Sequence, residues 1–216
     1  MDDSDQACAY AQADFERPNT LFLEMFARHF PDFTQGRLLD LGCGPADIPL
    51  RFVNAYSGIE LVVVDGAQAM IDLAEKAIEG AGAAARIQTV CWHVGEQTCP
   101  EIVGGPFDGV ISNSFLHHLD DPSILWNTVI DQAKPGSPVL VMDLKRPHNV
   151  SAARAFVEEY SGNEPELLRQ DFFRSLLAAY REQELREQLV EVGLGHLNVE
   201  QISDLHLAVY GRLLKR

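Results

Sequence analysis

Residues 38–47, Leu-Leu-Asp-Leu-Gly-Cys-Gly-Pro-Ala-Asp, decide the fold of this chain. An apolar strand, interrupted only by Asp40, runs directly into a Gly-x-Gly turn, and a helix is expected from Asp47 onward. Gly42 and Gly44 can adopt positive φ and carry no Cβ, so a ligand can come close to their backbone. Ligands of open α/β sheets bind just beyond the carboxyl ends of the strands, where this turn lies. The stretch therefore predicts a site for a nucleotide-like ligand.

Two acidic residues restrict which kind of nucleotide could bind at this turn. A dinucleotide-binding turn follows the pattern Gly-x-Gly-x-x-Gly/Ala, whereas this chain has Asp47 at the sixth position. A carboxylate there would repel a pyrophosphate at the helix N-terminus, but it is compatible with a ligand that has a positive centre and no phosphate. The second acid is Asp65, which follows Val62-Val63-Val64 and can accept hydrogen bonds from both ribose hydroxyls of an adenosine.

Short apolar runs alternate with amphipathic stretches over residues 36–143. The expected strands are 37–42, 59–65, 87–93, 107–113 and 138–143, and the expected helices between them are 47–56, 67–80 and 122–133. This alternation indicates βαβ units and a parallel sheet with helices on both faces. Outside this region, apolar residues at helical spacing from Leu21 to Phe30 predict a helix that Pro31 ends. After it come helices over 151–160, 165–180 and 181–192, and a hairpin of strands 197–203 and 207–213.

The length of 216 residues fits one domain over 1–216, with a helical arm at 1–35 and a helical insertion at 148–180. The insertion is either an additional packing layer or a lid that shapes the substrate pocket and excludes water. Hydrophobic residues make up 46% of the chain and charged residues 23%, which is typical of a globular protein and excludes a wholly disordered one.

The charge balance restricts the possible partners. Asp and Glu outnumber Lys and Arg by 32 to 17, a formal charge of -15, so we expect no nucleic-acid partner and no membrane association. The four cysteines are scattered without a C-x-x-C pair, which favours free thiols in a reducing compartment, and we predict no metal site. No signal-peptide pattern and no apolar run of about 18–20 residues occur, so we expect a soluble, cytoplasmic protein.

Four motifs in order resemble one family. The runs L-D-L-G-C-G-P and V-V-V-D-G-A-Q-A-M resemble the first motif and the following region of class I S-adenosylmethionine-dependent methyltransferases. The run F-D-G-V-I-S-N-S-F-L-H-H-L-D-D-P is similar to that family's fourth strand and its loop, and A-K-P-G-S-P-V-L-V-M-D-L to its fifth strand. The resemblance covers residues 36–144 and, more loosely, 181–213.

The resemblance implies a Rossmann-like fold, an α/β three-layer sandwich whose seven strands have the order 3-2-1-4-5-7-6 and whose last strand is antiparallel. It also implies that S-adenosylmethionine is the cofactor and S-adenosylhomocysteine its product. Asp40, Gly42, Cys43 and Gly44 would surround the methionyl part and Asp65 would hold the ribose. The other implied cofactor contacts are Gly66 and Met70 near the adenine, Val94 and Glu96 at its edge, and Asn113 and Ser114 after the fourth strand.

His117 and His118 are the candidate catalytic residues, because a histidine titrates near neutral pH and both follow the fourth strand at the ligand edge. Neighbouring residues point in different directions, so at most one is expected to face the site, and each is equally compatible with a packed or surface histidine. Polar residues at the same edge either recognise a substrate or only stabilise loops: Asp143, Lys145, Arg146, Asp204 and His206.

The sequence thus favours methyl transfer to a small-molecule acceptor by in-line displacement, which requires mainly the alignment of nucleophile, methyl carbon and sulfur. The alternatives are an oxidoreductase that uses an NAD-type nucleotide, which Asp47 disfavours, and a cofactor-binding subunit without turnover. A protein acceptor is also compatible with the acidic charge. The residues do not specify the acceptor, the methylated atom or the oligomeric state.

Overall fold

The computed structural model describes residues 7, 10, 11, 13–95 and 104–214. Seven strands form one sheet in the order β3-β2-β1-β4-β5-β7-β6. Strands β1 to β5 run parallel, whereas β7 is antiparallel to both β5 and β6, so the predicted strand order and the antiparallel last strand are confirmed. The strands are β1 (Gln35–Leu41), β2 (Gly58–Asp65), β3 (Ile87–Cys91), β4 (Gly109–Asn113), β5 (Pro138–Leu144), β6 (Asn198–Gln201) and β7 (His206–Arg212).

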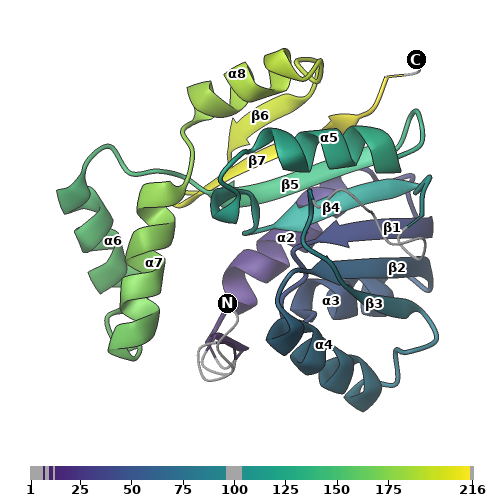
Figure 1. Ribbon diagram of the computed structural model, residues 1–216, viewed down its shortest axis with the longest axis horizontal. Helices are drawn as coiled ribbons and strands as arrows, with labels where there is room; N and C mark the ends of the chain where they lie inside the picture. The colour runs from purple at the N-terminus through teal and green to yellow at the C-terminus, as the bar shows by residue number, and fades with distance from the viewer. Residues whose placement is uncertain (1–6, 8–9, 12, 96–103, 215–216) are drawn as a thin grey trace.

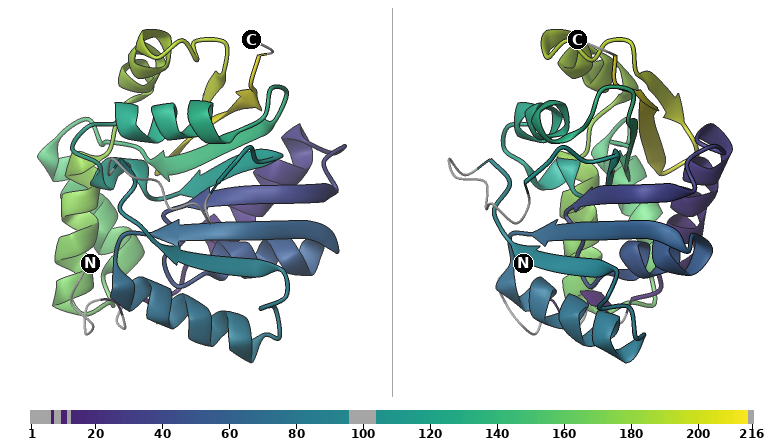
Figure 2. Two further views of the ribbon diagram at one scale, coloured as in Figure 1. Left: turned by 45° about the vertical axis from the view of Figure 1, so that its right-hand side comes forward. Right: turned by 90° about the vertical axis from the view of Figure 1, so that its right-hand side faces the viewer.

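Helices cover both faces of this sheet (Figures 1 and 2). Those described are α2 (Glu16–His29), α3 (Asp47–Ala55), α4 (Gln68–Gly80), α5 (Ser123–Gln132), α6 (Val150–Ser161), α7 (Glu166–Ala178), α8 (Glu182–Glu191) and the short 3-10 helix η2 (Leu116–His118). Helices α2, α3 and α4 pack one face through one hydrophobic core, and α5 and α8 pack the other face through a second. Because both faces are covered, the central strands are apolar at nearly every position rather than at every other one.

The expected elements occur with small shifts at their ends. Strand β4 begins two residues later than predicted, because Phe107 makes only an isolated bridge to Ala133. Strand β3 ends at Cys91, and the next amide, that of Trp92, donates to the carbonyl of Asp65 at 2.9 Å. Helix α2 begins at Glu16, earlier than the apolar spacing indicated. Its first turn is polar and lies partly at the surface, so the spacing of apolar residues does not reveal it.

The predicted helices of the insertion at 148–180 are α6 and α7, which lie side by side at the carboxyl edge of the sheet (Figures 1 and 2). They share a small apolar core of their own, formed by Ala153, Val157, Leu176 and Leu205 with neighbouring partly buried residues. Strands β1 and β2 point toward this pair, so the insertion stands over the edge at which a ligand is expected (Figure 2). None of the described helices is long and apolar enough to cross a bilayer.

Candidate functional site

The turn after β1 has the backbone conformation that its glycines predict. Gly42 and Gly44 have φ values of 79° and 51°, and the amides of Gly42 and Cys43 donate to the carbonyl of Val64 at 2.8 and 2.9 Å. A Cβ on Gly42 would lie 2.4 Å from Phe115, so this glycine makes room for a protein side chain. A Cβ on Gly44 would meet only the ring of Tyr10, at 4.0 Å, so Gly44 is the more open of the two positions.

Asp65, the last residue of β2, forms hydrogen bonds with the turn after β1 and with the start of the segment after β2. One of its carboxylate oxygens accepts from the amide of Gly44 at 3.0 Å, and the other accepts from the amide of Ala67 at 2.9 Å. Burial raises the pKa of Asp65, although these two backbone hydrogen bonds act against the increase. Since each carboxylate oxygen has a second lone pair, Asp65 can still accept from hydroxyl groups of a ligand.

Asp40, Asp65 and Asn113 project from the same face of the sheet. Asp40 lies opposite Val63 in β2 and opposite Ile111 in β4, and Asp65 and Asn113 follow these residues by two positions. Burial, followed by the charge of Asp65, raises the pKa of Asp40 to about 8. Asp40 Oδ2 and Asn113 Oδ1 are buried and have no hydrogen-bond partner among the described residues.

A buried acceptor without a partner costs about 1–3 kcal/mol, and these two project from the same face of neighbouring strands. Asn113 Oδ1 is an acceptor, and Asp40 also only accepts in its ionised form, which a nearby cation would favour; Asp65 adds further acceptor capacity beside them. A ligand that brings an ammonium group and hydroxyl groups would satisfy all three side chains. S-adenosylmethionine carries these groups on its methionyl and ribose parts, so the residues present fit this cofactor.

Other residues that the resemblance implied are packed against protein. Cys43 is buried in the core beneath α2 and α3, and Val94 lies in the core beneath α5. A Cβ on Gly66 would lie 2.8 Å from His93, so this glycine also accommodates a side chain. Ser114 has a φ of 55° and donates its amide to the carbonyl of Met142 at 2.9 Å. Glu96 lies outside the described residues.

The N-terminal arm covers this region, which the sequence did not indicate. Ala7 is fully buried and packs with Ala67 and Met70, and Tyr10 packs partly against the same cluster. Burial raises the pKa of Tyr10 to about 12, and the charges of Asp143 and Asp65 contribute to the same shift. Tyr10 therefore lies near the carboxyl ends of both β2 and β5, and it keeps its phenolic proton at neutral pH.

His117 is buried and paired with Asp143 at the end of β5. Its Nδ1 lies 2.5 Å from Asp143 Oδ1, and its backbone amide donates to Asp143 Oδ2 at 3.0 Å. The two side chains are only 3% and 6% exposed. Burial by itself would raise the pKa of Asp143, but the charge and hydrogen bond of His117 lower it overall. The carboxylate thus orients the ring and leaves Nε2 as the nitrogen available for other contacts.

His118 differs from its neighbour. Its side chain is exposed, and its ring lies against that of His117 with 4.1 Å between centroids. The other polar candidates of this edge mostly bond within the protein. Arg146 pairs with Glu184 at 2.9 Å, the Tyr160 hydroxyl bonds to Asp204, and His206 Nδ1 lies 2.9 Å from Ser203 Oγ. Within the described part of the chain, only His117 of the two histidines has a carboxylate partner that sets its orientation.

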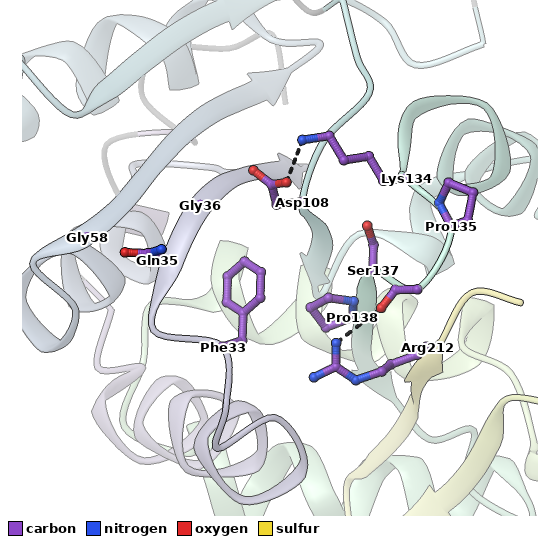
Figure 3. A pocket seen from close by; sticks show the side chains of 11 residues that line it. Phe33, Gln35, Gly36, Gly58, Asp108, Lys134, Pro135, Ser137, Pro138 and Arg212 are labelled. Carbon is purple, nitrogen blue, oxygen red and sulfur yellow. Dashed lines mark hydrogen bonds and ion pairs between the residues drawn. The ribbon is translucent and has the colours of Figure 1, made fainter. Parts of the chain in front are cut away.

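A cavity of about 560 Å³ lies at the opposite edge of the sheet, between the starts of β1, β2 and β5 (Figure 3). Its two cations are paired with carboxylates, Lys134 with Asp108 at 2.5 Å and Arg212 with Asp32 at 2.7 Å. Both cations of this cavity are already paired, and the cavity is open. It is therefore a weaker candidate for a cofactor site than the carboxyl edge of the sheet.

Part of the chain is similar to known methyltransferases. Residues 39–139 match the family model described as a methyltransferase domain. Over 104 residues, 46% of this chain, the sequence is 30% identical to the biotin biosynthesis bifunctional protein BioHC of Teredinibacter turnerae. The matched region is only 18% of the length of that protein.

Solved structures share the fold at low sequence identity. The plantazolicin methyltransferase BamL, in complex with a triazolic desmethylPZN analog and S-adenosylhomocysteine, has a TM-score of 0.75 at 14% identity, covering 98% of this chain and 91% of its own. A SAM-dependent methyltransferase from Aquifex aeolicus has a TM-score of 0.66 at 15% identity, covering 97% and 98%. The chain therefore has the Rossmann-like fold that its motifs predicted, and residues 39–139 are similar to a methyltransferase domain.

Proposed function

We propose that this chain is an S-adenosylmethionine-dependent methyltransferase that acts on a small-molecule acceptor. The observation that carries this proposal is the pair of buried, unpartnered acceptors, Asp40 Oδ2 and Asn113 Oδ1, beside Asp65 at the carboxyl edge of a methyltransferase domain. When bound, the cofactor supplies a methyl group activated by a sulfonium. Asp65 would hold the ribose hydroxyls, and Asp40 and Asn113 would bind the ammonium.

His117 is the proposed catalytic base. Asp143 holds its Nδ1, so Nε2 is the nitrogen that can take a proton from an acceptor hydroxyl or amine. The pair is buried, and burial strengthens the interaction between the ring and the carboxylate. An acceptor that is already anionic does not need this base, so the contribution of His117 depends on the nucleophile.

The insertion is proposed to act as a lid over the acceptor site. Helix α7 contacts η2, which carries His117 and His118, and Tyr160 of α6 bonds to Asp204 near the final hairpin. Together with the N-terminal arm, these helices would exclude water from the reacting groups. The acidic residues Asp143 and Asp204 at this edge, and the net charge of -15, favour a neutral or cationic acceptor over nucleic acid.

Isothermal titration with S-adenosylmethionine and with NAD tests the cofactor assignment. We expect micromolar affinity for S-adenosylmethionine and no heat with NAD. Asp65→Asn should weaken the affinity by about tenfold, because an amide cannot accept from both backbone amides and from the ribose. Glu60→Gln, an exposed acid on the same strand, is the matched control and should change nothing. Micromolar NAD binding without S-adenosylmethionine heat would reverse the assignment in favour of an oxidoreductase.

A screen of small acceptors then separates an enzyme from a cofactor-binding subunit. We expect S-adenosylhomocysteine to form with at least one hydroxyl- or amine-bearing acceptor. A protein that binds S-adenosylmethionine but forms no product with any small or protein acceptor would support the non-catalytic alternative instead.

A further inference from the structure

Three polar side chains from three elements form a continuous hydrogen-bonded line. Asn19 of α2 donates through its Nδ2 to Asp47 Oδ2 at the start of α3. Asn113, at the end of β4, donates through its own Nδ2 to Asn19 Oδ1 at 3.2 Å. Asp47 Oδ2 also accepts from Arg51 Nε at 3.0 Å. These hydrogen bonds connect Asp47, the residue that departs from the dinucleotide-binding pattern, with Asn113 at the candidate cofactor site.

The chemistry of Asp47 determines how both amides are oriented. An ionised carboxylate only accepts hydrogen bonds, so Asn19 must turn its NH₂ group toward Asp47 and its oxygen toward Asn113. Asn113 must therefore turn its NH₂ group toward Asn19. Its Oδ1 then faces away from Asn19, and this oxygen is buried without a partner among the described residues.

An amide held only by packing could rotate and exchange its oxygen and nitrogen, which have nearly the same shape. If Asn113 did so, an NH₂ group would stand where an acceptor now stands, on the same face as Asp40. A donor at that place would repel an ammonium, whereas an oxygen binds it. The orientation of this amide thus affects how strongly the site binds a cation.

We infer that Asp47 and Asn19 are positioning residues that hold Asn113 as a hydrogen-bond acceptor for the ammonium of the cofactor. The inference rests on the proposed function and deepens it, because it assigns a role to two residues that do not themselves contact the ligand. It also explains why a carboxylate stands at the N-terminus of α3, where a phosphate-binding turn would have a small residue.

Two ligands separate this role from a purely structural one. S-adenosylhomocysteine has the amino-acid part, and 5′-methylthioadenosine has the same adenosine thioether without it. We expect Asp47→Ala to weaken binding of S-adenosylhomocysteine by about tenfold and that of 5′-methylthioadenosine by less than about twofold, as measured by titration calorimetry. Asp47→Asn should retain both affinities within about threefold, because its amide oxygen can still accept from Asn19 and Arg51.

Glu16→Gln is the matched control, because Glu16 bonds to Arg51 but not to either amide. It should leave both affinities unchanged. In an Asn113→Ala background, Asp47→Ala should have no further effect on S-adenosylhomocysteine binding. An equal loss of affinity for both ligands in Asp47→Ala would overturn the inference and leave the proposed function intact. If the unmodified protein binds neither ligand, the proposed function itself is wrong, and this inference fails with it.

Discussion

Replacing Gly42 with alanine should destabilise the protein more than its backbone conformation alone explains. At a φ of +79°, a residue with a Cβ costs about 1–2 kcal/mol. The added Cβ would also lie 2.4 to 2.6 Å from three atoms of Phe115, and such overpacking costs a further 1–3 kcal/mol or so. The expected loss in free energy of unfolding is therefore about 2–5 kcal/mol.

Gly136→Ala isolates the backbone part of this cost. Gly136 has a nearly equal φ of +84°, and a Cβ there would have nothing within 4 Å. With a urea m value of about 2 kcal/mol/M, Gly136→Ala should lower the unfolding midpoint by about 0.5–1 M and Gly42→Ala by about 1–2.5 M. In a Phe115→Gly background, which removes all three of these atoms, Gly42→Ala should cost no more than Gly136→Ala. Equal midpoints for the two single variants would refute the reasoning that Phe115 requires this glycine.

Three further predictions concern the carboxyl edge. His117→Ala should reduce kcat by about 10²–10⁴-fold with an acceptor that must lose a proton, whereas exposed His118→Ala should stay within a few-fold, and steady-state product formation measures both. Because the pKa of Asp40 is raised to about 8, the native protein should lose the stability associated with the protonated form as pH rises from about 4 to 8. Urea unfolding at pH 5 and pH 8 should therefore show Asp40→Asn gaining stability relative to the native protein at the higher pH, and a pH-independent difference would contradict this. Tyr10→Ala should weaken S-adenosylhomocysteine binding about tenfold in calorimetry, because the ring covers Gly44, whereas tighter binding would mean that the arm obstructs the site.

Much of the fold could be predicted because its signals are local. Each parallel strand is a short apolar run followed by turn or helix chemistry, and the order of these units leaves few possible topologies. The positive φ of Gly42 and Gly44 and the acid at the end of β2 also belong to single short stretches. These features therefore appear in the structure where the sequence predicted them.

The contacts of the predicted site residues could not be derived in this way. The absent side chains of Gly42 and Gly66 are explained by Phe115 and His93, residues distant from them in the chain. Met70 packs against Ala7 of the arm, and no periodicity in the arm indicated that it would cover the sheet edge. Such contacts depend on how complete elements pack, which the local pattern does not specify.

The sequence by itself therefore determined the parallel sheet, its glycine turn and the acid that closes the second strand, because these follow from hydrophobic periodicity and backbone sterics within a few residues. Only the tertiary structure decided that His117 is held by Asp143 and that Asn113 is oriented through Asn19 by Asp47. The physical reason is that hydrogen bonds between side chains require an approach of about 3 Å, and only the packing of α2, η2 and the strands onto one another brings these residues so close.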